Sequence, residues 1–192
     1  MPHLTDLTGL LGIASVVTAL ASRLPRVAAL PKKQSAIFLT AVFALLLISF
    51  GDMPSAAYAR GMVGDLSITS VVLAWFAILQ LYRAAPAPSH HRHLLILLAA
   101  VAVIFYPMTL GMSLYDPYRL GYSDAPFVTV VLLIAALAWY KKSYLIALCL
   151  ALAVIAWSMG WYESTNLWDY LLDPLVGVYA LVLLMHQGLG KS

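Results

Sequence analysis

Three carboxylates lie close together near the carboxyl-terminal end of the chain, in the segment WYESTNLWDYLLDPLVGVY at positions 161–179. They are Glu163, Asp169 and Asp173, and Asp173 is followed directly by Pro174. An ionisable residue inside an apolar run is costly to place in a membrane, so it is a candidate for a functional site. A proline inside a helix also frees a backbone carbonyl, and a carboxylate beside a free carbonyl can hold a cation or a polar substrate.

Asp169 and Asp173 are four residues apart, which predicts that they share one face of a helix. The small residues Val176, Gly177 and Ala180 continue that face and would let a neighbouring helix approach closely. We therefore expect both carboxylates to point into a helix bundle. The structural alternative is an internal ion pair between Asp173 and one of two arginines, Arg60 or Arg119.

Two further segments combine acidic, aromatic and arginine residues: GDMPSAAYARGMVGDLS and LYDPYRLGYSDAP. Arginine binds carboxylates and phosphates in a bidentate manner, so two arginines among many acids would suit a zwitterionic or amine-bearing ligand, or else form salt bridges between loops. The aromatic residues would form either an interfacial belt or a surface that stacks on a ligand. The predicted ligand-binding residues are Asp173, Asp169, Glu163, Asp116, Arg119, Tyr118, Asp52, Arg60, Tyr58 and Trp168.

Several of the acidic residues also have a purely structural interpretation. Asp65 and Asp124 directly precede apolar runs, where a short acceptor side chain would cap a helix. Asn166 and Asp169 have the spacing of a cap pair. Asp116 and Asp52 lie close to prolines, so turn formation explains them as well as a function does.

The sequence contains none of the common catalytic or nucleotide-binding motifs, and we assign no catalytic residue. We expect no cofactor, although an oxygen-only cluster of the carboxylates would suit Mg²⁺ or Ca²⁺. His90, His91 and His93 resemble a metal-binding tract, but a polar loop next to a membrane explains them more simply. Cys149 is the single cysteine, so no disulfide framework is expected.

The composition predicts an all-α, integral membrane domain over residues 1–192. Of the 192 residues, 63% are hydrophobic and 10% are charged, and the mean hydropathy is +0.91. Apolar runs predict about seven transmembrane helices, at 8–23, 36–51, 66–82, 93–113, 126–140, 143–161 and 167–188. We interpret them as one leading helix, 8–23, followed by three helical hairpins, 36–82, 93–140 and 143–188. The first two hairpin loops share the order Tyr, Arg, Gly, Asp, which is a weak sign of repetition.

Basic residues predict the orientation of these helices. Nine of the eleven basic residues fall in loops on one side, and Arg60 and Arg119 fall on the other. All eight acidic residues lie on the side of Arg60 and Arg119. The amino terminus is therefore expected outside and the carboxyl terminus in the cytoplasm. We expect an integral protein of the bacterial inner (cytoplasmic) membrane, with an acidic outer face.

Three functional hypotheses follow from this pattern. The first is a transporter or substrate-capturing membrane subunit for a cationic, zwitterionic or polar ligand. The second is a non-catalytic accessory or assembly subunit of a larger membrane complex. The third is a metal-dependent enzyme that acts on a lipid-linked substrate at the outer leaflet; the sequence favours a non-enzyme. The expected partners are the lipid bilayer and other membrane subunits, and no nucleic acid.

Overall fold

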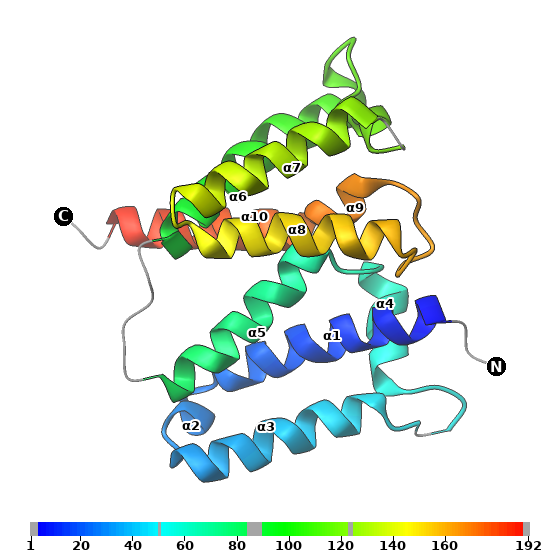
Figure 1. Ribbon diagram of the computed structural model, residues 1–192. Helices are drawn as coiled ribbons and strands as arrows, with labels where there is room; N and C mark the ends of the chain where they lie inside the picture. The colour runs from blue at the N-terminus through cyan, green and yellow to red at the C-terminus, as the bar shows by residue number, and fades with distance from the viewer. Residues whose placement is uncertain (1–3, 50, 84–89, 123–124, 190–192) are drawn as a thin grey trace. The chain divides into compact units, whose positions relative to one another are not determined.

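The computed structural model describes residues 4–49, 51–83, 90–122 and 125–189. Helices make up most of this part of the chain, and it contains no β-sheet. The all-α class predicted from the sequence is confirmed. The chain divides into two compact units, shown together in Figure 1.

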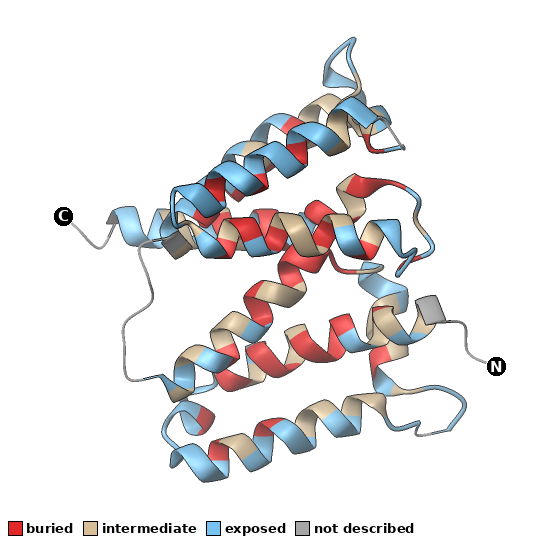
Figure 2. Ribbon diagram, in the orientation of Figure 1, coloured by how far each residue is buried: buried red, intermediate tan, exposed pale blue. Residues whose placement is uncertain are grey.

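Unit 1 comprises residues 1–66 and 70–86. Its helices are α1 (Leu4–Ser22), α2 (Pro25–Ala28), α3 (Lys32–Leu47), α4 (Ser55–Val63) and most of α5 (Ile68–Tyr82). One apolar cluster joins α1, α2, α3 and α5, and it is built from Ala19, Val27, Leu39, Ala74 and Ile78. A second cluster joins α1 to α4 through Ile13, Ala56 and Leu66. Figure 2 shows the buried residues along α1, against which α2, α3 and α4 pack.

Unit 2 comprises residues 67–69 and 87–192. It contains α6 (His90–Pro107), a π-helix η1 (Met108–Met112), a 3-10 helix η2 (Pro117–Gly121), α7 (Ala125–Tyr140), α8 (Tyr144–Ser158), α9 (Leu167–Leu171) and α10 (Pro174–Leu189). Helix α7 packs along α8, and α6 packs along α10. The short helices η2 and α9 contact each other. The predicted site residues of this unit lie on those two helices and the segments beside them.

Each of the seven apolar segments predicted from the sequence contains a helix, but the last segment is interrupted. Helix α9 ends at Leu171, Leu172 has an extended backbone, and α10 begins at Pro174. Helix α4 was not predicted, because it is short and lies in a segment whose prolines and glycines indicated a loop. The internal repeat cannot be followed at Asp124, which lies outside the described residues.

Among the described residues, one helical stretch has the length and composition needed to cross a membrane, His91–Met112 of 22 residues. Five shorter apolar helices accompany it: Asp6–Ser22, Ile68–Tyr82, Ala125–Tyr140, Tyr144–Ser158 and Pro174–Gly188. A bilayer core requires about 20 apolar residues per straight helix. The bundle of seven spans therefore stays a prediction.

Candidate functional site

Asp173 is a buried helix cap within unit 2. One carboxylate oxygen, Oδ1, accepts a hydrogen bond from the backbone N–H of Val176 at 2.9 Å, as expected of a residue that caps α10. The other oxygen, Oδ2, accepts from the backbone N–H of Ser67 at 3.0 Å and from its hydroxyl at 2.6 Å. The side chain is therefore held by three donors, and only 6% of the residue is exposed.

This arrangement corrects two predictions made from the sequence. Asp169 and Asp173 do not share a helix face, because α9 ends between them. Pro174 does not break a helix from within; it occupies the first position of α10, where a missing N–H costs nothing. The carbonyl of Leu171, close to the predicted break, accepts a hydrogen bond from the Thr69 hydroxyl at 2.7 Å. It is therefore not left free for a ligand.

Asp169 lies on α9 and forms a separate, half-buried polar cluster. The Tyr118 hydroxyl donates to both of its carboxylate oxygens, at 3.1 and 3.0 Å. The Ser164 hydroxyl donates to Oδ2. Burial, and then the hydrogen bond to Asp169, raise the pKa of the Tyr118 phenol above its ordinary value.

Asn166 and Trp168 hold α9 against η2 and so position Asp169. The Asn166 side chain caps α9 by accepting from the Trp168 N–H at 2.9 Å, and its amide donates to the Tyr118 carbonyl at 2.9 Å. The Trp168 indole donates to the Pro117 carbonyl at 2.9 Å. A Cβ at Gly121 would overlap the Asn166 side chain, so only glycine fits there. The predicted capping role of Asn166 is confirmed.

Aromatic rings surround Trp168 beside this cluster. Its ring centroid is 4.3 Å from that of Phe105 and 4.8 Å from that of Phe127. Phe105 is also 6.4 Å from Tyr118, centroid to centroid. Asp169 is thus one residue from an aromatic cluster made by α6, α7, η2 and α9, and a carboxylate beside aromatic rings is a combination that can bind an organic cation.

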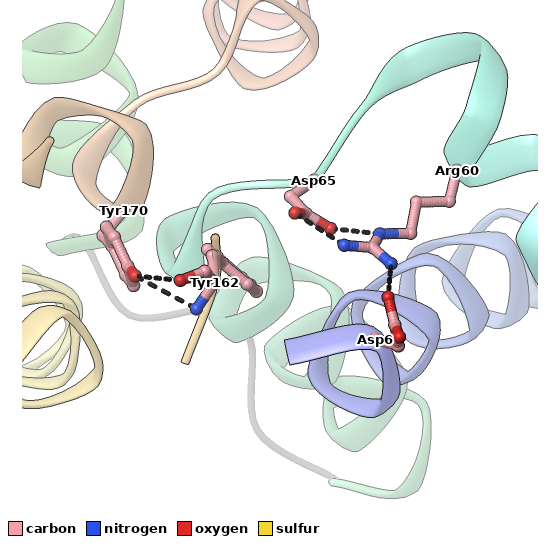
Figure 3. Close-up of polar contacts among 5 residues, drawn as sticks. All are labelled: Asp6, Arg60, Asp65, Tyr162 and Tyr170. Atoms are coloured by element: carbon pink, nitrogen blue, oxygen red, sulfur yellow. Dashed lines mark hydrogen bonds and ion pairs between the residues drawn. The ribbon is translucent and has the colours of Figure 1, made fainter. Parts of the chain in front are cut away.

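A second aromatic pair fixes the loop that precedes α9. The rings of Tyr162 and Tyr170 stack with centroids 4.9 Å apart. The Tyr170 hydroxyl accepts from the Tyr162 N–H at 3.0 Å and donates to the Ser164 carbonyl, also at 3.0 Å. Figure 3 shows the Tyr162–Tyr170 contact. Tyr170 is fully buried and so anchors the loop that carries Ser164 to Asp169.

Arg60 forms an ion-pair network inside unit 1 (Figure 3). Its guanidinium contacts Asp65 through Nε at 2.6 Å and a terminal nitrogen at 3.0 Å, and contacts Asp6 at 3.0 Å. The hydrogen bond to Asp65, with a further contribution from Asp6, keeps the pKa of Arg60 above its ordinary value. Asp65 is therefore an ion-pair partner of Arg60, and the prediction that it caps the next helix was wrong, because α5 begins only at Ile68.

The remaining predicted site residues are exposed or have local roles. Asp116 caps η2 by accepting from the Tyr118 N–H at 3.0 Å, which is the turn interpretation. Glu163 and Arg119 are exposed in unit 2, and Asp52 and Tyr58 are exposed in unit 1. The structure thus brings together Asp169, Tyr118 and Trp168, while Arg60, Asp52 and Tyr58 belong to the other unit.

The described residues contain no group of three or more His, Cys, Asp or Glu side chains that could hold a metal ion. The histidine tract begins α6, and the side chain of His90 lies outside the described residues. Cys149 is a free thiol buried in α8.

Ser67, Thr69 and Ser164 were not singled out from the sequence. Ser67 and Thr69 reach partners more than 100 residues away, so no local pattern could reveal them. Ser164 precedes Asn166 by two residues and accepts from its N–H, a local turn that its spacing could have indicated.

Comparisons with protein-family models, curated proteins and solved structures give no match for this chain.

Proposed function

We propose that this chain is a small multi-pass membrane protein that captures a cationic or zwitterionic ligand, with Asp169 as the charged group of the site. The proposal depends on the burial and the hydrogen-bond partners of Asp169. Its carboxylate is half-buried, accepts only from neutral hydroxyls, and forms no ion pair with any residue that the structure describes. A partly desolvated carboxylate without a cation attracts one.

Asp173 has a different role in this proposal. Its two oxygens accept from Ser67 and Val176, which stabilises the start of α10 and the backbone at Ser67. We therefore assign to Asp173 a structural role and to Asp169, with Tyr118 and Trp168, the binding role. This reverses the order of importance expected from the sequence.

The exposed surfaces of the helices support the membrane part of the proposal. Long apolar side chains are exposed along them, for example Ile104 at 63% on α6, Leu133 at 63% on α7 and Val178 at 58% on α10. Large exposed apolar surfaces mark contact with lipid or with another protein. The basic residues of the loops also support this part of the proposal. Their distribution predicts a membrane orientation in which the acidic segments lie on the outer side.

Equilibrium binding to the purified full-length protein tests the proposal. Choline, glycine betaine and ethanolamine are titrated into wild type, Asp169→Asn and the control Asp52→Asn, whose side chain is exposed in unit 1. We expect at least one compound to bind, and Asp169→Asn to lower its affinity about tenfold or more, since the ligand's cation loses the negative charge that attracts it. Equal affinities in all three proteins would refute the assignment.

A second candidate is the accessory subunit of a membrane complex. Two observations favour it: Arg60 and Asp173 are satisfied by partners within the chain, and apolar side chains are exposed on several helices. Native mass spectrometry of gently solubilised membranes distinguishes the two. A partner in fixed ratio would favour the accessory role, and a monomer that retains a small ligand would favour capture.

A further inference from the structure

Tyr106 carries a buried hydroxyl that the fold does not satisfy. It lies on α6, one residue before Pro107, and its hydroxyl oxygen has no hydrogen-bond partner among the residues that the structure describes. Buried hydroxyls are nearly always paired, and an unpaired one calls for an explanation. A bound ligand that forms a hydrogen bond with this hydroxyl would explain why the protein leaves it unpaired.

The hydroxyl lies near two segments that carry carboxylates. The Tyr106 ring packs against α10 at Gly177, one turn after Asp173, and the neighbouring Phe105 contacts Trp168, the residue before Asp169. Asp173 is held by Ser67 and Val176, whereas Asp169 pairs, among the residues described, with hydroxyls alone. A positively charged ligand group is therefore favoured beside Tyr106, and an anionic group is repelled.

Close helix packing and aromatic rings define the position. A Cβ at Gly177 would lie 3.5 Å from the Tyr106 ring and 3.0 Å from the Ala102 Cβ, so a glycine allows α10 to approach α6 there. The Phe105 ring is 5.5 Å from that of Tyr106 and 4.3 Å from that of Trp168. The Tyr106 ring is thus joined through Phe105 to the aromatic cluster beside Asp169.

The backbone next to Tyr106 is irregular. Pro107 follows it, and the helix then continues as the π-helix η1, in which Gly111 has a φ of 87°. A π-helical turn is rare and is found frequently at functional sites. The unpaired hydroxyl therefore lies at a distortion of α6 and not in a regular, fully packed stretch.

We propose that the Tyr106 hydroxyl anchors the ligand by accepting an N–H from a protonated primary amine. This inference rests on the proposed function and specifies its ligand. The ammonium group has the charge that Asp169 attracts and the N–H that the phenol oxygen lacks. A quaternary ammonium has the charge but no N–H. A free amine and the headgroup of phosphatidylethanolamine offer the same chemistry.

The test compares ethanolamine with choline, which differ in the presence of N–H groups on the cation. The full-length protein is titrated in nanodiscs of phosphatidylcholine in an amine-free buffer, by calorimetry. We expect ethanolamine to bind about tenfold more tightly than choline, because only the ethanolamine ammonium can donate an N–H to the phenol oxygen of Tyr106. Tyr106→Phe removes only the hydroxyl and should abolish this preference. The control Tyr115→Phe, at an exposed position, should keep it.

The outcomes separate this inference from the proposed function. Equal binding of ethanolamine and choline by wild type, or an unchanged preference in Tyr106→Phe, overturns the role of Tyr106 and leaves Asp169 untouched. Failure of every amine to bind wild type overturns both. Nanodiscs that contain phosphatidylethanolamine identify the source: loss of ethanolamine binding there assigns the site to the lipid headgroup, and unchanged binding assigns it to a free amine.

Discussion

Removal of the Asp173 carboxylate should destabilise unit 2 strongly. Asp173→Ala deletes the cap of α10, which costs about 1 kcal/mol. It also leaves the buried backbone N–H of Ser67 without the acceptor that it has at 3.0 Å. A buried unpaired donor costs about 1–3 kcal/mol, so we expect a total loss of about 3 kcal/mol. At about 2–4 °C per kcal/mol, Tm should fall by about 6–12 °C.

Thermal unfolding of the purified protein in detergent, followed by circular dichroism, measures this loss. Asp173→Asn should be intermediate, because an amide oxygen can replace one acceptor while its NH₂ group faces a second donor. Asp116→Ala is the matched control, since it removes the cap of the short helix η2 at a less buried position. If Asp173→Ala unfolds at the wild-type temperature while ligand binding is lost, the structural role assigned to Asp173 is wrong.

Three other predictions concern packing and pH. Gly9→Ala would push a Cβ into the ion pair that Arg60 makes in unit 1, and should lower the free energy of unfolding by about 1–3 kcal/mol. Gly61→Ala, with open space around it, should be neutral or stabilising. Equal Tm values for the two variants would contradict this. Gly121→Ala should lower Tm and also weaken amine binding, because it displaces the residues that hold α9; binding at wild-type affinity would argue against that coupling. The pKa of Tyr118 is raised in the folded state, so its hydrogen bond contributes fully below the unfolded pKa of about 10 and is lost as the pH rises above it. Wild type should therefore lose more stability than Tyr118→Phe in alkaline denaturation, and parallel curves would refute this.

Local patterns in the sequence were sufficient for the helical class and for the local contacts of two polar residues. Runs of apolar residues located a helix in each predicted segment, because helix formation in such a run depends on neighbours in sequence. Asn166 was a predicted cap, and turn formation was one of two interpretations of Asp116; both side chains do accept N–H groups two residues ahead.

Errors arose where local spacing allowed two structures. Asp173-Pro174 fits a proline kink inside a long helix and equally a capped helix start, and hydropathy does not distinguish them. Asp65 fits a helix cap and also an ion pair with Arg60, five residues earlier. In both cases, packing between segments that are distant in sequence decides which structure forms. The hydroxyl of Tyr106 could not have been identified from the sequence, because no sequence pattern shows that a buried hydroxyl lacks a hydrogen-bond partner.

The assignment of residues 67–69 to unit 2 has a consequence for biosynthesis. No single cut in the chain separates the two units, since unit 1 resumes at residue 70. A fragment of residues 87–192, expressed separately, would carry Asp173 without the two Ser67 donors and Leu171 without the Thr69 hydroxyl. Ser67 leaves the ribosome 106 residues ahead of Asp173. The nascent chain must therefore keep the Ser67 amide accessible until nearly all of unit 2 has been synthesised.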